Sequence, residues 1–302
     1  DLLQLFEKKP PTKAVAESYQ LETWLDSSKR VNQEYRFTAY KKLLAKEGKG
    51  NIIEQMDADT YKILDSCYNP SELNQEWNRR GLVYGHVQSG KTANYIGLIN
   101  RAFDAGYRIV IVLTGMTEDL RVQTQRRIDE GVVGQREQVK IGIGEMPKFQ
   151  SLPEVIPATS LKKDLKKNEA WQDNIISTNK KSIWVIKKNK AVLENLIMWL
   201  DKQRSEGENS RIYNAPFLVI DDEADNASIQ SLTKKDYEEW GVGQKLSKLD
   251  FDDCFSLNGF TEIIHFFKGV ARSNKKFVIS FTSGRTCCKK CIKIIPSIPP
   301  NG

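Results

Sequence analysis

A phosphate-binding pattern in the first third of the chain constrains the fold more than any other feature. Residues 85–92 read Gly-His-Val-Gln-Ser-Gly-Lys-Thr, the spacing of a glycine, four residues, a second glycine, a lysine and a threonine. Such a loop works between a strand and a helix, because its backbone N–H groups must converge on a phosphate at the helix N-terminus. The flanking residues agree: a β-prone run, 82–84, precedes the loop, and apolar residues at helical spacing follow over 93–105.

The pattern gives its members separate tasks. The residues expected to bind the nucleotide are Gly85, Gln88, Ser89, Gly90, Lys91 and Thr92. Lys91 would bring positive charge to the outer phosphates and act in catalysis, and the Thr92 hydroxyl would ligate Mg²⁺. The sequence therefore predicts a site for ATP and Mg²⁺, whereas Tyr68 and Trp77 are only candidates for contacting the base.

The order of the other apolar runs predicts an α/β fold with a mostly parallel sheet flanked by helices. Further strands are expected at 108–113, 183–186, 217–220 and 276–282, and helices at 118–127, with Thr117 as N-cap, and at 191–204. Strands that alternate with helices form parallel sheets, and ligands bind at the carboxyl ends of such strands.

The chain divides by pattern into three parts. Residues 1–78 form a polar N-terminal helical region, with amphipathic helices expected at 15–29 and 32–46. Residues 79–282 form the nucleotide-binding domain, with a glycine- and proline-rich insertion at about 131–181. Residues 283–302 form an irregular tail.

A second chemical cluster follows the run 217–220, where the chain reads Asp221-Asp222-Glu223-Ala224-Asp225. Carboxylates at the ligand edge of a sheet suit phosphoryl transfer, since one can hold Mg²⁺ and a neighbour can orient the attacking water. Counting from the end of the apolar run makes Asp221 the metal ligand. Taking Asp222 to Asp225 as one unit makes Asp222 the ligand and Glu223 the catalytic base, which we prefer.

Composition sets limits on location and partners. The mean hydropathy is −0.51, and the longest apolar runs are too short to cross a bilayer, so we expect a cytoplasmic protein with no membrane partner. The net charge of +7 is compatible with DNA as a partner, although it also suits an ordinary solvated surface.

Cys287, Cys288 and Cys291 have no nearby histidine to complete a zinc site. Without a signal peptide or an initiating Met, the start resembles a fragment.

The tetrad Asp222-Glu223-Ala224-Asp225 resembles the Asp-Glu-Ala-Asp motif of superfamily-two helicases. The resemblance implies a RecA-like P-loop NTPase lobe, with Lys91 and Thr92 in the phosphate loop and with Asp222 and Glu223 handling metal and water. Residues 113–117 occupy the position of a motif that touches the nucleic-acid backbone in that family.

The chain resembles the bacterial Z-one domain proteins more closely over roughly residues 80–280. The segments 81–92, 187–189 (Lys-Lys-Asn) and 220–228 look like signatures of that family, which is labelled as endonucleases and associated with helicase regions in restriction and phage defence. The resemblance implies the ATP-binding, Mg²⁺-dependent hydrolase lobe of a helicase- or translocase-like endonuclease acting on DNA.

The resemblance stops after the strand at 276–282. The family pattern continues with a Tyr-Thr-Ala-Thr-Pro-like turn, whereas this chain reads Thr-Ser-Gly-Arg-Thr over 282–286, and a shifted reading frame or a truncation would explain the difference. A second helicase lobe or a nuclease would then be a partner, because this chain has no Pro-Asp nuclease motif. The alternatives are a nucleotide-gated switch or scaffold without motor activity, and a plain DNA-binding protein.

Overall fold

The computed structural model describes residues 23–25, 34–71, 78–84, 90–147, 149, 152, 154–165, 180–202, 216–222 and 276–282. Their central feature is a six-stranded sheet in the order β1-β8-β7-β2-β6-β5. Its strands are β1 (Asn78–Tyr84), β2 (Ile109–Thr114), β5 (Val155–Pro157), β6 (Lys181–Lys187), β7 (Phe217–Asp222) and β8 (Lys276–Thr282). Every neighbouring pair is parallel, which confirms the predicted α/β class with a parallel sheet.

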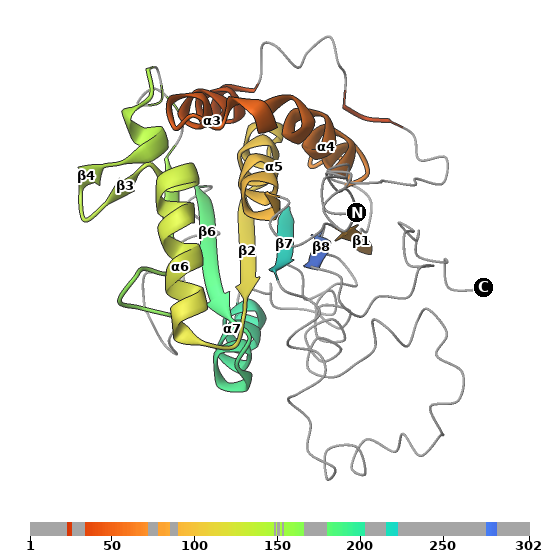
Figure 1. Ribbon diagram of the computed structural model, residues 1–302. Coiled ribbons are helices and arrows are strands. Elements are labelled where there is room, and N and C mark those ends of the chain that lie inside the picture. Colours follow the sequence, from red (N-terminus) through yellow and green to blue (C-terminus); the bar gives the residue numbers. More distant parts are fainter. Residues whose placement is uncertain are drawn as a thin grey trace, which may run out of the picture.

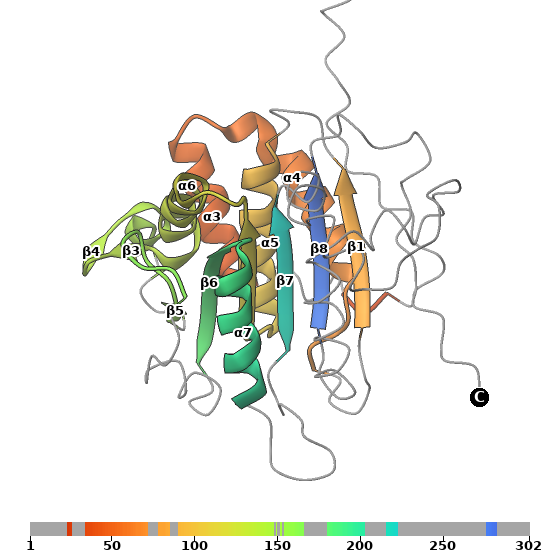
Figure 2. The same ribbon diagram turned by 90° about the horizontal axis from the view of Figure 1, so that it is seen from below.

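Helices cover both faces of this sheet (Figures 1 and 2). On one face lie α5 (Lys91–Ala105) and α6 (Glu118–Ile128), and on the other lies α7 (Lys190–Lys202). Two N-terminal helices, α3 (Tyr35–Lys46) and α4 (Ile53–Asp65), pack outside α5 and form a further layer (Figure 1). A 3₁₀ turn, η1 (Gly50–Ile52), joins them.

The central strands are buried on both faces, as expected for a parallel sheet between two helical layers. Along β7, Leu218 and Ile220 belong to the core beneath α5, whereas Phe217 and Val219 belong to the core beneath α7. This alternation has period two, so Asp222 continues the α5 face and Asp221 the α7 face.

Buried charges fix the N-terminal helices on α5. Arg101 of α5 is 1% exposed, forms ion pairs of 2.8 Å with Glu34 and 2.6 Å with Asp57, and lies 3.8 Å from the centre of the Phe37 ring. Asp104, near the end of α5, accepts hydrogen bonds from the backbone N–H groups of Arg36 and Phe37, at 3.1 and 3.0 Å. The first turn of α3 is thereby capped by a side chain from another helix.

The stretch predicted as an insertion, 131–181, contains both an excursion and part of the sheet. A π-helical turn, η2 (Asp129–Val133), leads into a hairpin of β3 (Gln135–Arg136) and β4 (Val139–Lys140), followed by η3 (Gly142–Glu145). The edge strand β5 also lies within it. Three residues with one proline carry too little periodicity to be recognised as a strand.

The remaining predicted elements agree with the structure within a few residues. The helix expected at 32–46 is α3, and the one expected at 15–29 falls outside the described residues except for 23–25. No helix in the described part of the chain combines the length and apolarity needed to cross a membrane.

Candidate functional site

The parallel arrangement brings the two predicted motifs to one edge of the sheet. Strand β1, which enters the phosphate loop, pairs with β8, and β8 pairs with β7. In register, Tyr84 lies beside Thr282 and Asp222 beside Phe281, so the carboxyl ends of the three strands are level. Only β8 therefore lies between β7, which ends in the acidic residues, and β1, which leads into the phosphate loop.

The first turn of α5 suits an anion. Gly90 precedes the helix with a φ of 76°, a left-handed conformation that glycine adopts without strain, and an added Cβ would meet nothing within 4 Å. Among the described residues, no side chain caps this end, and its first turn contains no acidic residue. A phosphate at this end of the helix would meet the N–H groups of the first turn and the positive end of the helix dipole. Gly85, Gln88 and Ser89 lie outside the described residues.

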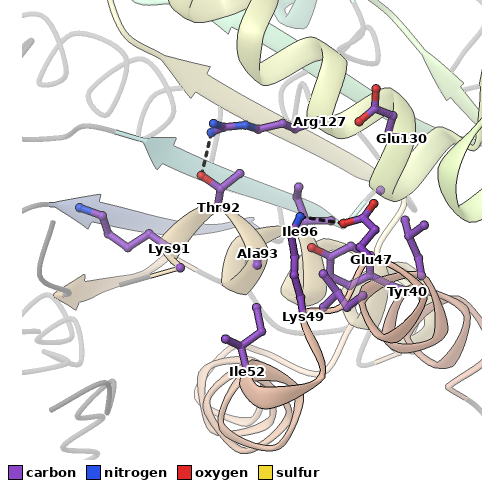
Figure 3. A pocket seen from close by; sticks show the side chains of 14 residues that line it. Tyr40, Glu47, Lys49, Ile52, Lys91, Thr92, Ala93, Ile96, Arg127 and Glu130 are labelled. Atoms are coloured by element: carbon purple, nitrogen blue, oxygen red, sulfur yellow. Dashed lines mark hydrogen bonds and ion pairs between the residues drawn. The ribbon is translucent and has the colours of Figure 1, made fainter. Parts of the chain in front are cut away.

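Thr92 contacts a residue that sequence analysis missed. Arg127, in the last turn of α6, donates a hydrogen bond of 3.1 Å from its Nη1 to the Thr92 hydroxyl (Figure 3). Arg127 is exposed, so its guanidinium has room to change rotamer. Nothing in the sequence separates it from Arg126, because only packing of α6 beside α5 decides which arginine faces the site.

The two adjacent aspartates have different surroundings. The Asp221 carboxylate is 5% exposed and forms a 2.8 Å ion pair with Lys188, whose ammonium is 7% exposed. Lys188 also donates to the backbone oxygen of Asp222 at 2.8 Å. Asp222 is half-buried on the opposite face, the face that carries α5. One carboxylate is thus tied to a lysine, and the other faces the phosphate-loop helix.

Tyr95 of α5 has a perturbed phenol near the first turn of the helix. Its phenol is buried, and its pKa is raised, first by burial and then by the negative charge of Asp222. The hydroxyl groups of Thr92 and Thr124 and the charge of Arg127 act in the opposite direction. A hydroxyl in the first turn of α5 and a carboxylate on the α5 face of β7 are both oxygen ligands of the kind that Mg²⁺ takes in proteins.

The lysines of the signature 187–189 hold the edge of the sheet together. Lys187 forms a 3.0 Å ion pair with Glu118, and Arg121 forms one of 2.6 Å with the same carboxylate. The hydrogen bond from Arg121, followed by that from Lys187, lowers the pKa of Glu118. Thr117 accepts a hydrogen bond from the Leu120 N–H at 3.4 Å and caps α6, as predicted. Within residues 113–117, Thr117 therefore has a structural role as the cap of α6.

A cavity of about 450 Å³ opens beside the first turn of α5 (Figure 3). It is lined by Gly90, Lys91, Thr92, Ala93 and Ile96 of the loop end and α5, by Tyr40, Leu43, Leu44, Glu47, Lys49 and Ile52 from the N-terminal region, and by Arg127, Glu130 and Gly131. Tyr68 is not among these residues, and its backbone oxygen accepts a hydrogen bond from Tyr107.

Two further predicted residues, Glu223 and Trp77, lie outside the described residues. Within the described ranges, no three His, Cys, Asp or Glu side chains cluster as a metal site. A Mg²⁺ ion bound through a nucleotide takes only one or two protein ligands, so Thr92 and Asp222 still fit it.

Comparison of the chain with protein-family models and with curated proteins finds no match.

Proposed function

We propose that the chain is a RecA-like P-loop NTPase lobe that binds ATP with Mg²⁺ and hydrolyses it. The observation that carries the proposal is the position of Thr92 and Asp222. Thr92 lies in the first turn of α5, and Asp222 lies at the carboxyl end of β7, on the sheet face that α5 covers. Phosphoryl transfer depends mainly on positioning and on electrostatic stabilisation, and this edge gathers the groups for both.

The proposal assigns each group a task. The first turn of α5 and Lys91 hold the phosphates, and Thr92 and Asp222 hold Mg²⁺, which neutralises charge on the phosphate oxygens. Asp222 is preferred to Asp221 because it continues the face of β7 that α5 covers, whereas Asp221 continues the face that α7 covers. Glu223, the next residue after β7, is the proposed base that orients water.

Arg127 would also act at the phosphate end of the site. A metal ion bound to the Thr92 hydroxyl would remove the acceptor that Arg127 now uses at 3.1 Å, and cation repulsion would favour another rotamer. Arg127 and Lys91 line the same cavity, so in another rotamer the guanidinium would still be close to the bound phosphates. An arginine supplied in cis stabilises transition-state charge in some NTPases. We propose this task for Arg127.

The DNA-directed part of the function rests on the resemblance to Z-one proteins and superfamily-two helicases, together with the net charge of +7. Translocation on DNA in restriction or phage defence, with a nuclease or second helicase lobe as partner, is the corresponding proposal.

Hydrolysis assays on the full chain test the proposal. We expect Mg²⁺-dependent release of phosphate from ATP that Lys91→Ala and Glu223→Gln abolish, and that duplex or single-stranded DNA stimulates. Lys62→Ala, an exposed lysine of α4 outside the cavity, is the matched control and should behave as wild type. Equal rates in wild type and Lys91→Ala would contradict hydrolysis at this site. ATP binding without hydrolysis would favour the nucleotide-gated switch.

A further inference from the structure

The cavity beside the first turn of α5 differs chemically from the phosphate end that it adjoins. Its walls away from Lys91 and Thr92 are apolar and come from Tyr40, Leu43, Leu44, Ile52 and Ile96. Four of these five are buried, with exposures of 2–5%, and Ile52 is half-buried. Such walls offer little to a phosphate and suit the face of a flat ring.

We propose that this cavity holds the nucleobase and ribose of the triphosphate whose phosphates lie on the first turn of α5. The inference rests on the proposed function and adds that the N-terminal helical region is part of the nucleotide site. The same pocket contains Gly90, Lys91 and Thr92 at one end and the apolar walls at the other, so one ligand would contact both. A volume of about 450 Å³ lies in the usual range of small-ligand sites.

The rim carries groups for the polar edges of a nucleoside. Glu47 and Lys49 form an exposed ion pair of 2.7 Å at one side of the opening, and Glu130 and Arg127 line the other side (Figure 3). Carboxylates accept hydrogen bonds from ribose hydroxyls and from exocyclic amino groups. Glu47 and Lys49 lie between α3 and η1, and Glu130 lies in η2, so segments other than the phosphate loop would select the base and the sugar.

Buried polar contacts join the wall-forming helix α3 to α5. Arg101 pairs with Glu34 and Asp57, and Asp104 caps α3, so the helix that provides Tyr40 and Leu44 is fastened to α5. Gly131 closes the far side tightly, since a Cβ there would lie 2.7 Å from Ile96 Cγ2 and 3.3 Å from Tyr40 Cε2. A preformed cavity costs little ordering entropy on binding.

Comparing ATP with tripolyphosphate distinguishes binding in the cavity from binding of the phosphates alone. Calorimetry on the full chain would compare ATP with tripolyphosphate, which lacks base and sugar, for wild type, Ile52→Trp and Asn51→Trp. The indole at 52 fills the cavity, whereas the exposed neighbour Asn51 does not line it and is the matched control. We expect Ile52→Trp to weaken ATP roughly 10- to 30-fold, as when a base loses its apolar contact, and to leave tripolyphosphate unchanged.

Hydrogen exchange gives a second test that needs no variant. ATP should slow exchange at residues 40–52 beyond the effect of tripolyphosphate. Equal protection by the two ligands, or wild-type ATP affinity in Ile52→Trp, would overturn the inference and leave the phosphate site intact. If Ile52→Trp kept its affinity for ATP but lost affinity for single-stranded DNA, the cavity would be a site for a nucleic-acid base, and the inference would also be overturned. If wild type bound neither ATP nor tripolyphosphate, the proposed function itself would fail.

Discussion

The buried pair of Lys188 and Asp221 allows a double-mutant cycle with a magnitude set by the structure. The ammonium and carboxylate are 2.8 Å apart and only 7% and 5% exposed. Lys188→Met would leave a buried carboxylate without this cation, and Asp221→Asn would leave the cation with the backbone oxygen of Asp222. Breaking a buried pair from one side costs about 3–5 kcal/mol, so each single variant should lose that much unfolding free energy.

The double variant carries the sharper expectation. Replacing both partners removes the uncompensated charge, and the loss should be about 2–3 kcal/mol smaller than the sum of the single losses. Urea unfolding followed by circular dichroism measures all four proteins. Lys187→Met is the matched control: Lys187 is 26% exposed, its pairs with Glu118 at 3.0 Å and Asp164 at 3.8 Å are less buried than that of Lys188, and such partly exposed pairs contribute about 1 kcal/mol or less. Similar losses for Lys187→Met and Lys188→Met would refute the argument from burial.

Three further predictions concern neighbouring groups. Asp222→Asn should weaken Mg²⁺-dependent ATP binding about tenfold or more, whereas folded Asp221→Asn should bind ATP as wild type does. Calorimetry with and without Mg²⁺ measures both affinities, and the reverse result would make Asp221 the metal ligand. Arg127→Ala should slow hydrolysis by at least roughly tenfold with little change in ATP affinity, and the adjacent Arg126→Ala should not; equal rates would remove Arg127 from the site. Burial raises the pKa of the Asp104 carboxyl to about 6, above its ordinary range, so the folded state binds this proton more tightly than the unfolded state. Stability of wild type relative to Asp104→Asn should therefore fall by about 2 kcal/mol as the pH rises from about 4 to 6, and a flat difference in denaturation midpoints would contradict the shift.

Local pattern was sufficient to predict the elements that surround the site. Runs of four to seven mostly apolar or β-prone residues predicted β2, β6, β7 and β8, and the glycine at 106 marked the end of α5. Each of these signals lies within one element and depends on burial or backbone conformation at that element alone. The ends of strands were less visible, since β7 extends through Asp221 and Asp222, two charged residues that a hydrophobic run excludes.

Features that depend on packing between elements could not be predicted in the same way. The position of Arg127 beside Thr92 follows from how α6 lies against α5, and the cavity requires α3 and η1 to pack beside both. Which aspartate lies on which face of the sheet also depends on packing: Asp222 continues the face of β7 that α5 covers, and Asp221 continues the face that α7 covers. No spacing in the sequence encodes these contacts between distant segments.

The measurement that tests the central claim most directly is ATP binding by calorimetry with and without Mg²⁺, wild type beside Lys91→Ala. The account predicts that wild type binds ATP, that Mg²⁺ tightens binding, and that Lys91→Ala loses it. Binding of equal affinity in both proteins would place the nucleotide elsewhere, and no binding by a folded wild-type chain would contradict the account.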